Sequence, residues 1–266
     1  MNLNKVLVIL DLKGLVINSF SSVNTAHSSE IQTNDIENQI LGGLETFIGK
    51  FLDPALKLAS TPMAVIGVLD GGKSYRRSID SGYSNRPKGA TPESVVRARD
   101  ECLGRAKKVM VSIGCPLVCL KGEEADDVIA FLAARSVFNM TAIYTVDYDL
   151  VALNSDKVKV FIGGQIREDM RGVPSNLTTL YKSMVGDTSD TYIGIRNFGE
   201  KSWASMVEEF GYDGMEQLDS LVANNNKAGA IAKYSTIQEI YKQIPKEPKA
   251  QILAKCLEAQ KIISGK

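Results

Sequence analysis

The sequence has a single histidine, His27, among 266 residues, and this scarcity excludes several kinds of site. A histidine-dependent catalytic triad, or a metal centre built from several imidazoles, would have to rely on this one residue. His27 stands in a polar, serine-rich stretch, where a surface loop is the simplest interpretation. If the chain is an enzyme, we expect carboxylates and lysines to carry its chemistry.

Cysteines and long hydrophobic runs are also scarce. The four cysteines are Cys102, Cys115, Cys119 and Cys256. They have no Cys-x-x-Cys spacing, so we expect buried free thiols and neither a zinc site nor a disulfide framework. No apolar run reaches the roughly 18 residues that a membrane helix needs, and the run at 6–10 is too short for a signal-peptide core. The sequence therefore predicts a soluble, cytoplasmic protein.

Short, continuous apolar runs recur along the first two thirds of the chain, at 5–11, 63–70, 116–121, 141–147 and 158–163. Runs of this length predict strands that are buried on both faces of a sheet. Helical patterns lie between them, including one at 35–60 with a break near Asp53 and Pro54. This order of elements predicts an α/β fold with a mostly parallel, doubly wound sheet.

Two further boundaries follow from local signals. Thr91 and Pro92 predict a helix with Thr91 as its N-cap and Pro92 as its first residue, running to about Ile113. The strand signal stops near Pro174, and the remaining sequence has the pattern of helices joined by Gly, Asn and Pro turns. We therefore expect an α/β core over 1–173 and a helical part over 174–266.

Acidic residues follow the ends of four predicted strands. Asp11 ends the first strand, Asp70 ends the second, Glu124 follows the third, and Asp147 and Asp149 follow the fourth. The carboxyl ends of parallel strands meet at one edge of the sheet, and open α/β sheets bind their ligands there. The sequence therefore predicts a cluster of carboxylates at this edge.

The stretch GEEADDVIAFLAARS, residues 122–136, adds acids at the start of a predicted helix. Its apolar residues share one face of a helical wheel, and its acids, Asp126 and Asp127 among them, lie on the opposite half. Interaction with the positive end of the helix dipole would explain these acids if the helix stood alone. Their position after a strand end favours membership of the same cluster. Asp187 and Asp190, in MVGDTSD, have the i, i+3 spacing of one helix face.

So many carboxylates cannot share one site as bare anions, because mutual repulsion would raise their pKa values. Divalent cations would relieve the repulsion, and oxygen ligands without histidine suit Mg²⁺ or Mn²⁺. Two such ions about 4 Å apart are the usual arrangement for phosphodiester cleavage. With these nine acids set aside, 22 acids face 31 Lys and Arg residues, which is an excess of nine positive charges. An acidic site in a basic body suits a polyanion, although ordinary mixed surface charge would give the same count.

Several motifs, in order and spacing, resemble those of the 5′ nucleases, the family of the 5′–3′ exonuclease domain of bacterial DNA polymerase I and the phage flap endonucleases. GEEADD (122–127) is similar to the family's GxEADD, and TVDYD (145–149) to its TxDxD. GDTSDTYIG (186–194) is similar to GDxSDxxxG, and it leads into NFGEKS (197–202), similar to a helix–hairpin–helix turn. The resemblance spans residues 5 to about 210 and implies a PIN-like sheet.

The resemblance also implies roles for individual residues. One Mg²⁺ ion would be held by Asp11, Asp70, Glu124, Asp126 and Asp127. A second Mg²⁺, with Mn²⁺ as an alternative for both ions, would be held or tuned by Asp147, Asp149, Asp187 and Asp190. Basic residues of an arch at about 71–99 would contact the scissile phosphate, namely Arg76, Arg86 and Lys88. DNA would be bound by Tyr83 and by a hairpin at about 186–211, which often holds K⁺ in this family, through Gly194, Asn197, Gly199, Lys201 and Ser202.

The sequence departs from the family pattern at three places. The family's opening reads roughly IDGNSLLYRAF, and here it is LDLKGLVINSF, so that its Arg position is Asn18. A customary glycine of the hairpin is Asn197, a residue that tolerates the left-handed region of backbone space. The family's YKANR is YSNR here, with Ser84 in place of the lysine. Arg76, Arg86 or Lys88 would then have to supply the missing cation.

The sequence thus predicts a Mg²⁺-dependent, structure-specific 5′ nuclease, a 5′–3′ exonuclease and flap endonuclease of DNA replication or repair. Its substrate would be DNA with a 5′ flap or a 5′ end, with an RNA–DNA hybrid as a further substrate. The resemblance implies a monomer that does not act at a membrane and a stand-alone enzyme such as phages encode. Two alternatives stay open. The chain could be a DNA-binding protein of the same fold with impaired catalysis, or an RNA-cleaving, toxin-like nuclease, which would leave 175–266 unexplained.

Overall fold

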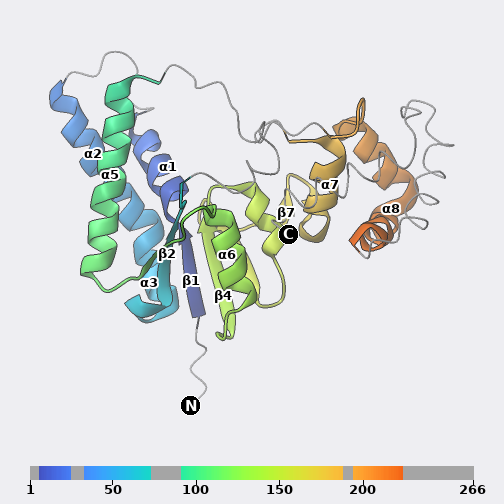
Figure 1. The fold of residues 1–266 in the computed structure, drawn as a ribbon, viewed down its shortest axis with the longest axis horizontal. Coiled ribbons are helices and arrows are strands. Elements are labelled where there is room, and N and C mark those ends of the chain that lie inside the picture. Colours follow the sequence, from blue (N-terminus) through green and yellow to red (C-terminus); the bar gives the residue numbers. More distant parts are fainter. Residues whose placement is uncertain (1–5, 25–32, 73–90, 188–193, 224–266) are drawn as a thin grey trace. The chain divides into compact units, whose positions relative to one another are not determined.

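The structure is a computed structural model that describes residues 6–24, 33–72, 91–187 and 194–223 (Figure 1). Several residues singled out above lie outside these ranges: His27, Arg76, Tyr83, Ser84, Arg86, Lys88, Asp190 and Cys256. Across the described ranges, no helix combines the length and the apolar character that crossing a bilayer requires.

A six-stranded sheet forms the centre of the first part of the chain. Its strands are β1 (Val6–Asp11), β2 (Val65–Leu69), β3 (Leu117–Cys119), β4 (Met140–Thr145), β5 (Val158–Ile162) and β6 (Gln165–Ile166). They lie in the order β3-β2-β1-β4-β5-β6, with β1 to β5 parallel and β6 antiparallel to β5. The predicted mostly parallel sheet is confirmed. The sequence did not indicate β6, because two exposed residues carry no apolar pattern.

Strand β1 contributes side chains to two hydrophobic cores, one on each face of the sheet. Val8 and Leu10 lie in one core, and Leu7 and Ile9 lie in the other. Because successive side chains of a strand point to opposite faces, a strand that is covered on both sides needs an unbroken apolar run. This is why the sequence at 6–10 reads as continuous hydrophobic residues without alternation.

Helices cover both faces of the sheet (Figure 1). The first core is closed by α1 (Leu12–Asn24), α2 (Thr33–Phe47), α3 (Asp53–Ala59) and α5 (Glu93–Ser112). The second is closed by α6 (Ala125–Ala134) and a 3₁₀ segment, η3 (Tyr148–Leu153). A π-helical turn, η1 (Ile48–Leu52), joins α2 to α3, so the predicted helical break falls at the start of α3.

The start of α5 differs from the prediction by one residue. Pro92 is the N-cap, with φ −53° and ψ 140°, and the helix begins at Glu93. Proline fixes only φ, and its value suits an extended residue before a helix as well as a first helical residue. Thr91 is therefore not the cap. The predicted end is confirmed, since Ile113 is the C-cap.

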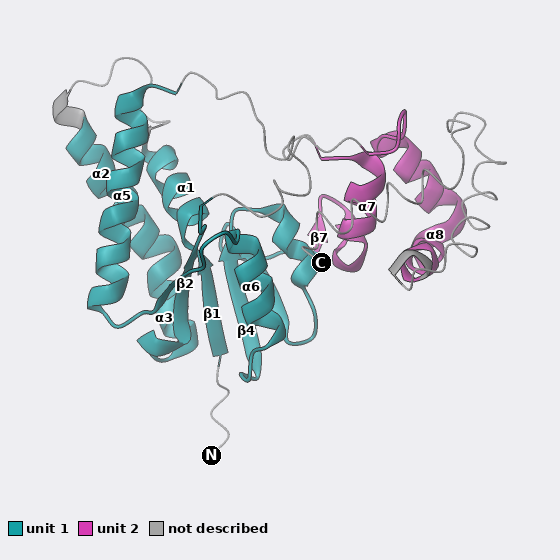
Figure 2. Cartoon of the chain, in the orientation of Figure 1, with its two compact units in different colours: residues 1–75, 88–168 teal, residues 76–87, 169–266 magenta. Residues whose placement is uncertain are grey.

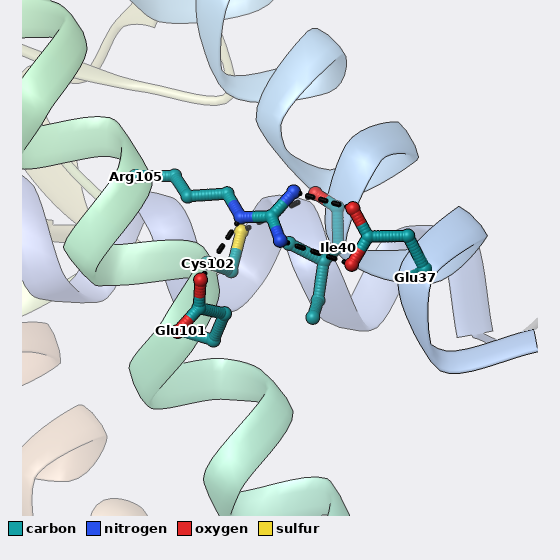
Figure 3. A network of polar contacts seen from close by, with 5 residues as sticks. All are labelled: Glu37, Ile40, Glu101, Cys102 and Arg105. Atoms are coloured by element: carbon teal, nitrogen blue, oxygen red, sulfur yellow. Dashed lines mark hydrogen bonds and ion pairs between the residues drawn. The ribbon is translucent and has the colours of Figure 1, made fainter. Parts of the chain in front are cut away.

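Helices α2 and α5 are joined by a polar network around Arg105 (Figure 3). Its guanidinium donates to both carboxylate oxygens of Glu37 on α2, at 2.6 and 2.9 Å, and to Glu101 on its own helix at 3.1 Å. Beside it, the Cys102 thiol is buried and lies 3.7 Å from the carbonyl oxygen of Ile40. This two-pronged contact links the two helices at their solvent-exposed edge.

The thiols only partly match the expectation. Cys102 and Cys115 are free and buried, as predicted, but Cys119 is free and exposed at the end of β3. The expectation that all thiols are buried was therefore wrong for Cys119. The run at 116–121 looked fully buried, yet β3 is the edge strand of the sheet, and an edge strand keeps solvent contact.

The chain divides into two compact units, with the change at Glu168–Asp169, whereas the sequence places the boundary at 173/174 (Figure 2). The second unit contains β7 (Asp169–Met170), β8 (Val173–Pro174), η4 (Ser175–Leu177), α7 (Thr178–Val185) and α8 (Glu200–Ala223). It has its own core, which includes Leu180, Met184, Trp203 and Met206. Gly211, with φ 64° and ψ 171°, interrupts α8.

Candidate metal centre

The strand order creates a topological switch point between β1 and β4. From β1 the chain adds β2 and β3 on one side and β4 and β5 on the other. The crevice outside the carboxyl ends of the strands at such a point is where open α/β sheets bind ligands. Asp11 ends β1 and Thr145 ends β4. Their side chains meet there, since the Thr145 hydroxyl donates to Asp11 Oδ2 at 2.8 Å.

A chain of hydrogen bonds continues from Thr145 through the TVDYD motif. The Asp147 amide donates to Thr145 Oγ1 at 2.9 Å, and the Asp149 amide donates to Asp147 Oδ1 at 2.9 Å. Asp147 is thereby the N-cap of η3. Because Thr145 is fully buried, its hydroxyl holds both Asp11 and the backbone of Asp147 in place. The first position of the motif therefore needs a hydroxyl side chain.

Asp70 joins the end of β2 to the start of α6. Its Oδ1 accepts from the Ala125 amide at 3.1 Å, and its Oδ2 accepts from Lys13 Nζ at 2.9 Å. Ala125 is the first residue of α6, so the side chain of Asp70, which follows β2, caps this helix. Glu124, directly before the helix, has an extended backbone, and Asp126 and Asp127 lie in its first turn.

Gly71 allows the two loops that carry these acids to cross in contact. Its amide donates to the Glu123 carbonyl at 2.8 Å, and its carbonyl accepts from the Gly122 amide at 3.1 Å. A Cβ atom on Gly71 would stand 1.6 Å from the Leu120 carbonyl oxygen, so no other residue fits. The crossing sets Asp70 beside the start of α6.

Burial and like charges act on two of the carboxyl groups. Burial raises the pKa of Asp126 well above its ordinary value, and the charges of Asp147, Asp11, Asp149 and Glu124 raise it further. Burial also raises the pKa of Asp11, and bonds from Thr145 and from the Gly14 backbone offset only part of the effect. The carboxylates around Asp126 therefore repel one another.

Asp70 behaves in the opposite way. Burial acts to raise its pKa, but the hydrogen bonds from Lys13 and Ala125 and the charge of Lys13 outweigh burial, and the pKa falls below its ordinary value. Asp70 is thus held as an anion by groups of the chain itself.

The chemistry of this donor set fits a hard divalent cation, although its geometry is open. The set consists of carboxylates without histidine, and added positive charge would relieve the repulsion at Asp126 and Asp11. As the side chains stand, no three His, Cys, Asp or Glu groups in the described ranges are placed to hold one ion. Mg²⁺ tolerates such a site, because it keeps several water ligands and often uses only one or two carboxylates.

In the second unit, Asp187 is paired with Lys182. The Lys182 ammonium donates to Asp187 Oδ2, and both side chains are about nine-tenths buried. Asp187 follows α7 and lies outside any helix, so the helical spacing expected for Asp187 and Asp190 was wrong at Asp187. The glycine of the GD pair explains this, since Gly186 has φ 94° and ends α7.

The turn before α8 is closed by internal contacts. Gly194 approaches α7 so closely that a Cβ would stand 2.4 Å from the Gly186 amide nitrogen, and the Ile195 amide donates to the Met184 carbonyl. Asn197 has φ 61°, the left-handed conformation that its glycine-like position predicts. Gly199 precedes α8 and accepts from the Trp203 amide at 3.0 Å. Lys201 and Ser202 therefore lie in the first turn of α8, where amides have no acceptor within the helix.

Comparison with known families decides the assignment. Residues 6–181 match the model of the family described as 5′-3′ exonuclease, N-terminal resolvase-like domain. The chain belongs to this 5′–3′ exonuclease family. The resemblance drawn from the motifs is thereby confirmed.

Curated members of the 5′–3′ exonuclease group are similar over most of the chain. The 5′-3′ exonuclease of Bacillus subtilis strain 168 is 28% identical over 243 residues, which cover 84% of this chain and 75% of that protein. The 5′-3′ exonuclease of Aquifex aeolicus strain VF5 is 29% identical over 220 residues, or 78% and 70%. DNA polymerase I of Chloroflexus aurantiacus is 28% identical over 169 residues, which cover 57% of this chain but only 17% of the polymerase.

Solved structures of similar fold come from bacteriophage T5. A T5 flap endonuclease crystallised with DNA and metal ions has a TM-score of 0.61 and 19% identity, covering 97% of this chain and 86% of that one. A T5 5′-exonuclease with bound zinc has a TM-score of 0.56 and 17% identity, covering 96% and 100%. At this level of identity, the likeness supports the fold.

The sequence analysis missed three residues that donate hydrogen bonds to carboxylates predicted as metal ligands. They are Lys13 at Asp70, Thr145 at Asp11, and Lys182 at Asp187. Thr145 could have been found, since it is the first letter of the TVDYD motif. Lys13 stands where the family opening has Asn, which was a visible signal. No motif drew attention to Lys182.

Proposed function

We propose that this chain is a Mg²⁺-dependent, structure-specific 5′ nuclease that hydrolyses DNA phosphodiesters as a 5′–3′ exonuclease and flap endonuclease. The observation that carries the proposal is the bonded set of Asp11, Thr145 and Asp147 at the switch point of a 5′–3′ exonuclease fold. A DNA-binding protein without catalysis would have no use for buried carboxylates that repel one another and so weaken the fold.

The ligand sets proposed for two ions follow the motifs. Asp11, Asp70, Glu124, Asp126 and Asp127 would hold one ion. Asp147 and Asp149, with Asp187 and Asp190 of the second unit, would hold or tune the other. When bound, divalent cations would supply an activated water and stabilise the charge that develops on the phosphate.

The residues of the chain itself have positioning and electrostatic tasks. Thr145 keeps Asp11 and the Asp147 backbone in fixed orientations. Asp70 caps α6 and so fixes the first turn that carries Asp126 and Asp127. Fixed ligands matter because small errors in the placement of a reacting group are costly. No imidazole base is needed in this scheme.

The second unit would bind duplex DNA in the manner of a helix–hairpin–helix, with K⁺ as a further ligand of its turn. The α8 amides at Lys201 and Ser202 are suited to a phosphate, because a helix start carries unpaired N–H groups and positive potential. Lys201 is exposed and would contact the same phosphate. The left-handed Asn197 and the close approach of Gly194 support a compact turn here.

The arch assignments at Arg76, Tyr83, Arg86 and Lys88 remain part of the proposal. They rest on the order Asp70, Arg76, Tyr83 in the sequence and on the need for a cation where the family lysine is Ser84. Arginine suits this place because its planar fork holds phosphate through two hydrogen bonds.

A panel of labelled substrates tests the proposed function. A 5′-flap duplex, a nicked duplex, a blunt duplex, an RNA–DNA hybrid and single-stranded RNA are incubated with Mg²⁺ and, separately, with EDTA. We expect EDTA-sensitive cleavage of the flap and of DNA 5′ ends, with 5′-phosphate and 3′-hydroxyl products. Tight DNA binding without turnover would instead support the impaired alternative, and cleavage of RNA alone would support a toxin-like nuclease.

A further inference from the structure

Lys13 places a positive charge at the carboxylate cluster. It lies in the first turn of α1, two residues after Asp11, and its ammonium donates to Asp70 Oδ2 at 2.9 Å. The Lys13 side chain is 50% exposed and that of Asp70 is 38% exposed, so the ion pair faces solvent. A dissolved cation can therefore reach the same carboxylate that Lys13 occupies.

Both oxygens of Asp70 are already in use. Oδ1 accepts from the Ala125 amide, and Oδ2 accepts from Lys13. The amide bond is part of the helix cap of α6, whereas the Lys13 contact is a solvent-exposed ion pair of the kind that contributes little to stability. A divalent ion that approaches Asp70 would displace Lys13 more readily than it would displace the backbone of α6.

We propose that Lys13 is a positioning residue that competes with divalent cations for Asp70, so that opening of this ion pair sets the metal affinity of the centre. The inference rests on the proposed metal-dependent function. Two effects act together. The ammonium occupies a ligand oxygen, and its charge repels an incoming ion. A single charge and a double charge about 6 Å apart in a water-like medium repel enough to change a binding constant by about tenfold.

Direct titration of the metal-free protein with Mn²⁺ or Mg²⁺ by calorimetry tests this without any need for activity. Lys13→Met should bind the ion about tenfold more tightly than the wild type does. Lys13→Gln is a second neutral variant and should give the same shift. Lys13→Arg keeps the charge and should retain wild-type affinity. The matched control is Lys57→Met, an exposed lysine of α3, which leads into the amino end of β2 whereas Asp70 follows the carboxyl end, and it should change nothing.

A double-mutant cycle identifies the partner. In an Asp70→Asn background, Lys13→Met should tighten binding much less, because the competition at Asp70 has gone. If the wild type binds the ion but neither neutral variant binds it more tightly, the role of Lys13 is wrong while the proposed function stands. If the wild type binds no divalent ion at all, the metal-dependent function fails and this inference fails with it.

Discussion

The hydroxyl of Thr145 links two strand ends through hydrogen bonds to Asp11 and to the Asp147 backbone. Thr145→Val keeps the shape of the side chain but removes both bonds. We expect a loss of about 1–3 kcal/mol in the free energy of unfolding, the usual effect of leaving buried polar groups unpaired. Thr145→Ser keeps the hydroxyl and should lose much less. Urea denaturation of the three proteins in EDTA measures this. Equal stability of the Val variant and the wild type would show that the Thr145 hydroxyl does not hold the two strand ends together.

Asp126 illustrates a conflict between function and stability. Its pKa is raised in the folded protein, so the folded state keeps a proton that the unfolded chain has released. The metal-free fold therefore loses stability as pH rises from the ordinary Asp pKa of 3.8 through the raised value. Asp126→Asn removes the charge and should raise the melting temperature in EDTA at pH 7.

The stability that Asp126→Asn gains should depend on pH. Below the ordinary Asp pKa both states are protonated, so the Asn variant and the wild type should melt at nearly the same temperature there. A gain of 1 kcal/mol corresponds to about 2–4 °C for a domain of this size. Melting curves in EDTA at several pH values provide the test, and a variant that is less stable at pH 7 would show that Asp126 carries no charge penalty.

At the scale of elements, the crossing at Gly71 sets the end of β2 against the start of α6. Gly71→Ala would place a methyl group within 1.6 Å of a backbone oxygen, so one of the two loops must move. We expect destabilisation beyond the roughly 0.5–3 kcal/mol of an ordinary substitution. Gly104→Ala is the control, since Gly104 lies inside α5 with open space around it and should gain about 1 kcal/mol. Urea denaturation of both variants tests this. If Gly71→Ala were as stable as Gly104→Ala, the two loops could not cross in such close contact.

Some elements could be predicted from the sequence, and others could not. The five parallel strands and the apolar face of α6 were predicted, because burial on two faces or on one leaves a clear hydrophobic period. The short β6, β7 and β8 escaped, since pairs of residues carry no period. The acids were predicted from strand ends, but their hydrogen-bond partners were not. Lys13 reaches Asp70 across 57 positions of the sequence, and Lys182 reaches Asp187 around the end of α7, so both contacts depend on the folded geometry.

At the scale of the whole molecule, the carboxylates come from two compact units. Seven of the nine lie in the first unit, and Asp187 and Asp190 belong to the second. The central claim is that the chain is a metal-dependent nuclease whose activity needs acids of both units. Asp187 is paired with Lys182 inside the second unit, and its removal leaves a buried ammonium unpaired, so the melting temperature of each variant is measured beside its activity. Glu209→Ala, which removes an exposed acid of α8, provides a charge-matched control in the same unit.

Single-turnover cleavage of a labelled 5′-flap duplex in Mg²⁺ by the wild type and by Asp187→Ala tests this claim most directly. DNA affinity of both proteins is measured in parallel without divalent ions. We expect the wild type to cleave and Asp187→Ala to lose roughly the 10²-fold or more expected of a transition-state contact, with DNA affinity little changed. Cleavage by Asp187→Ala at the wild-type rate would contradict it.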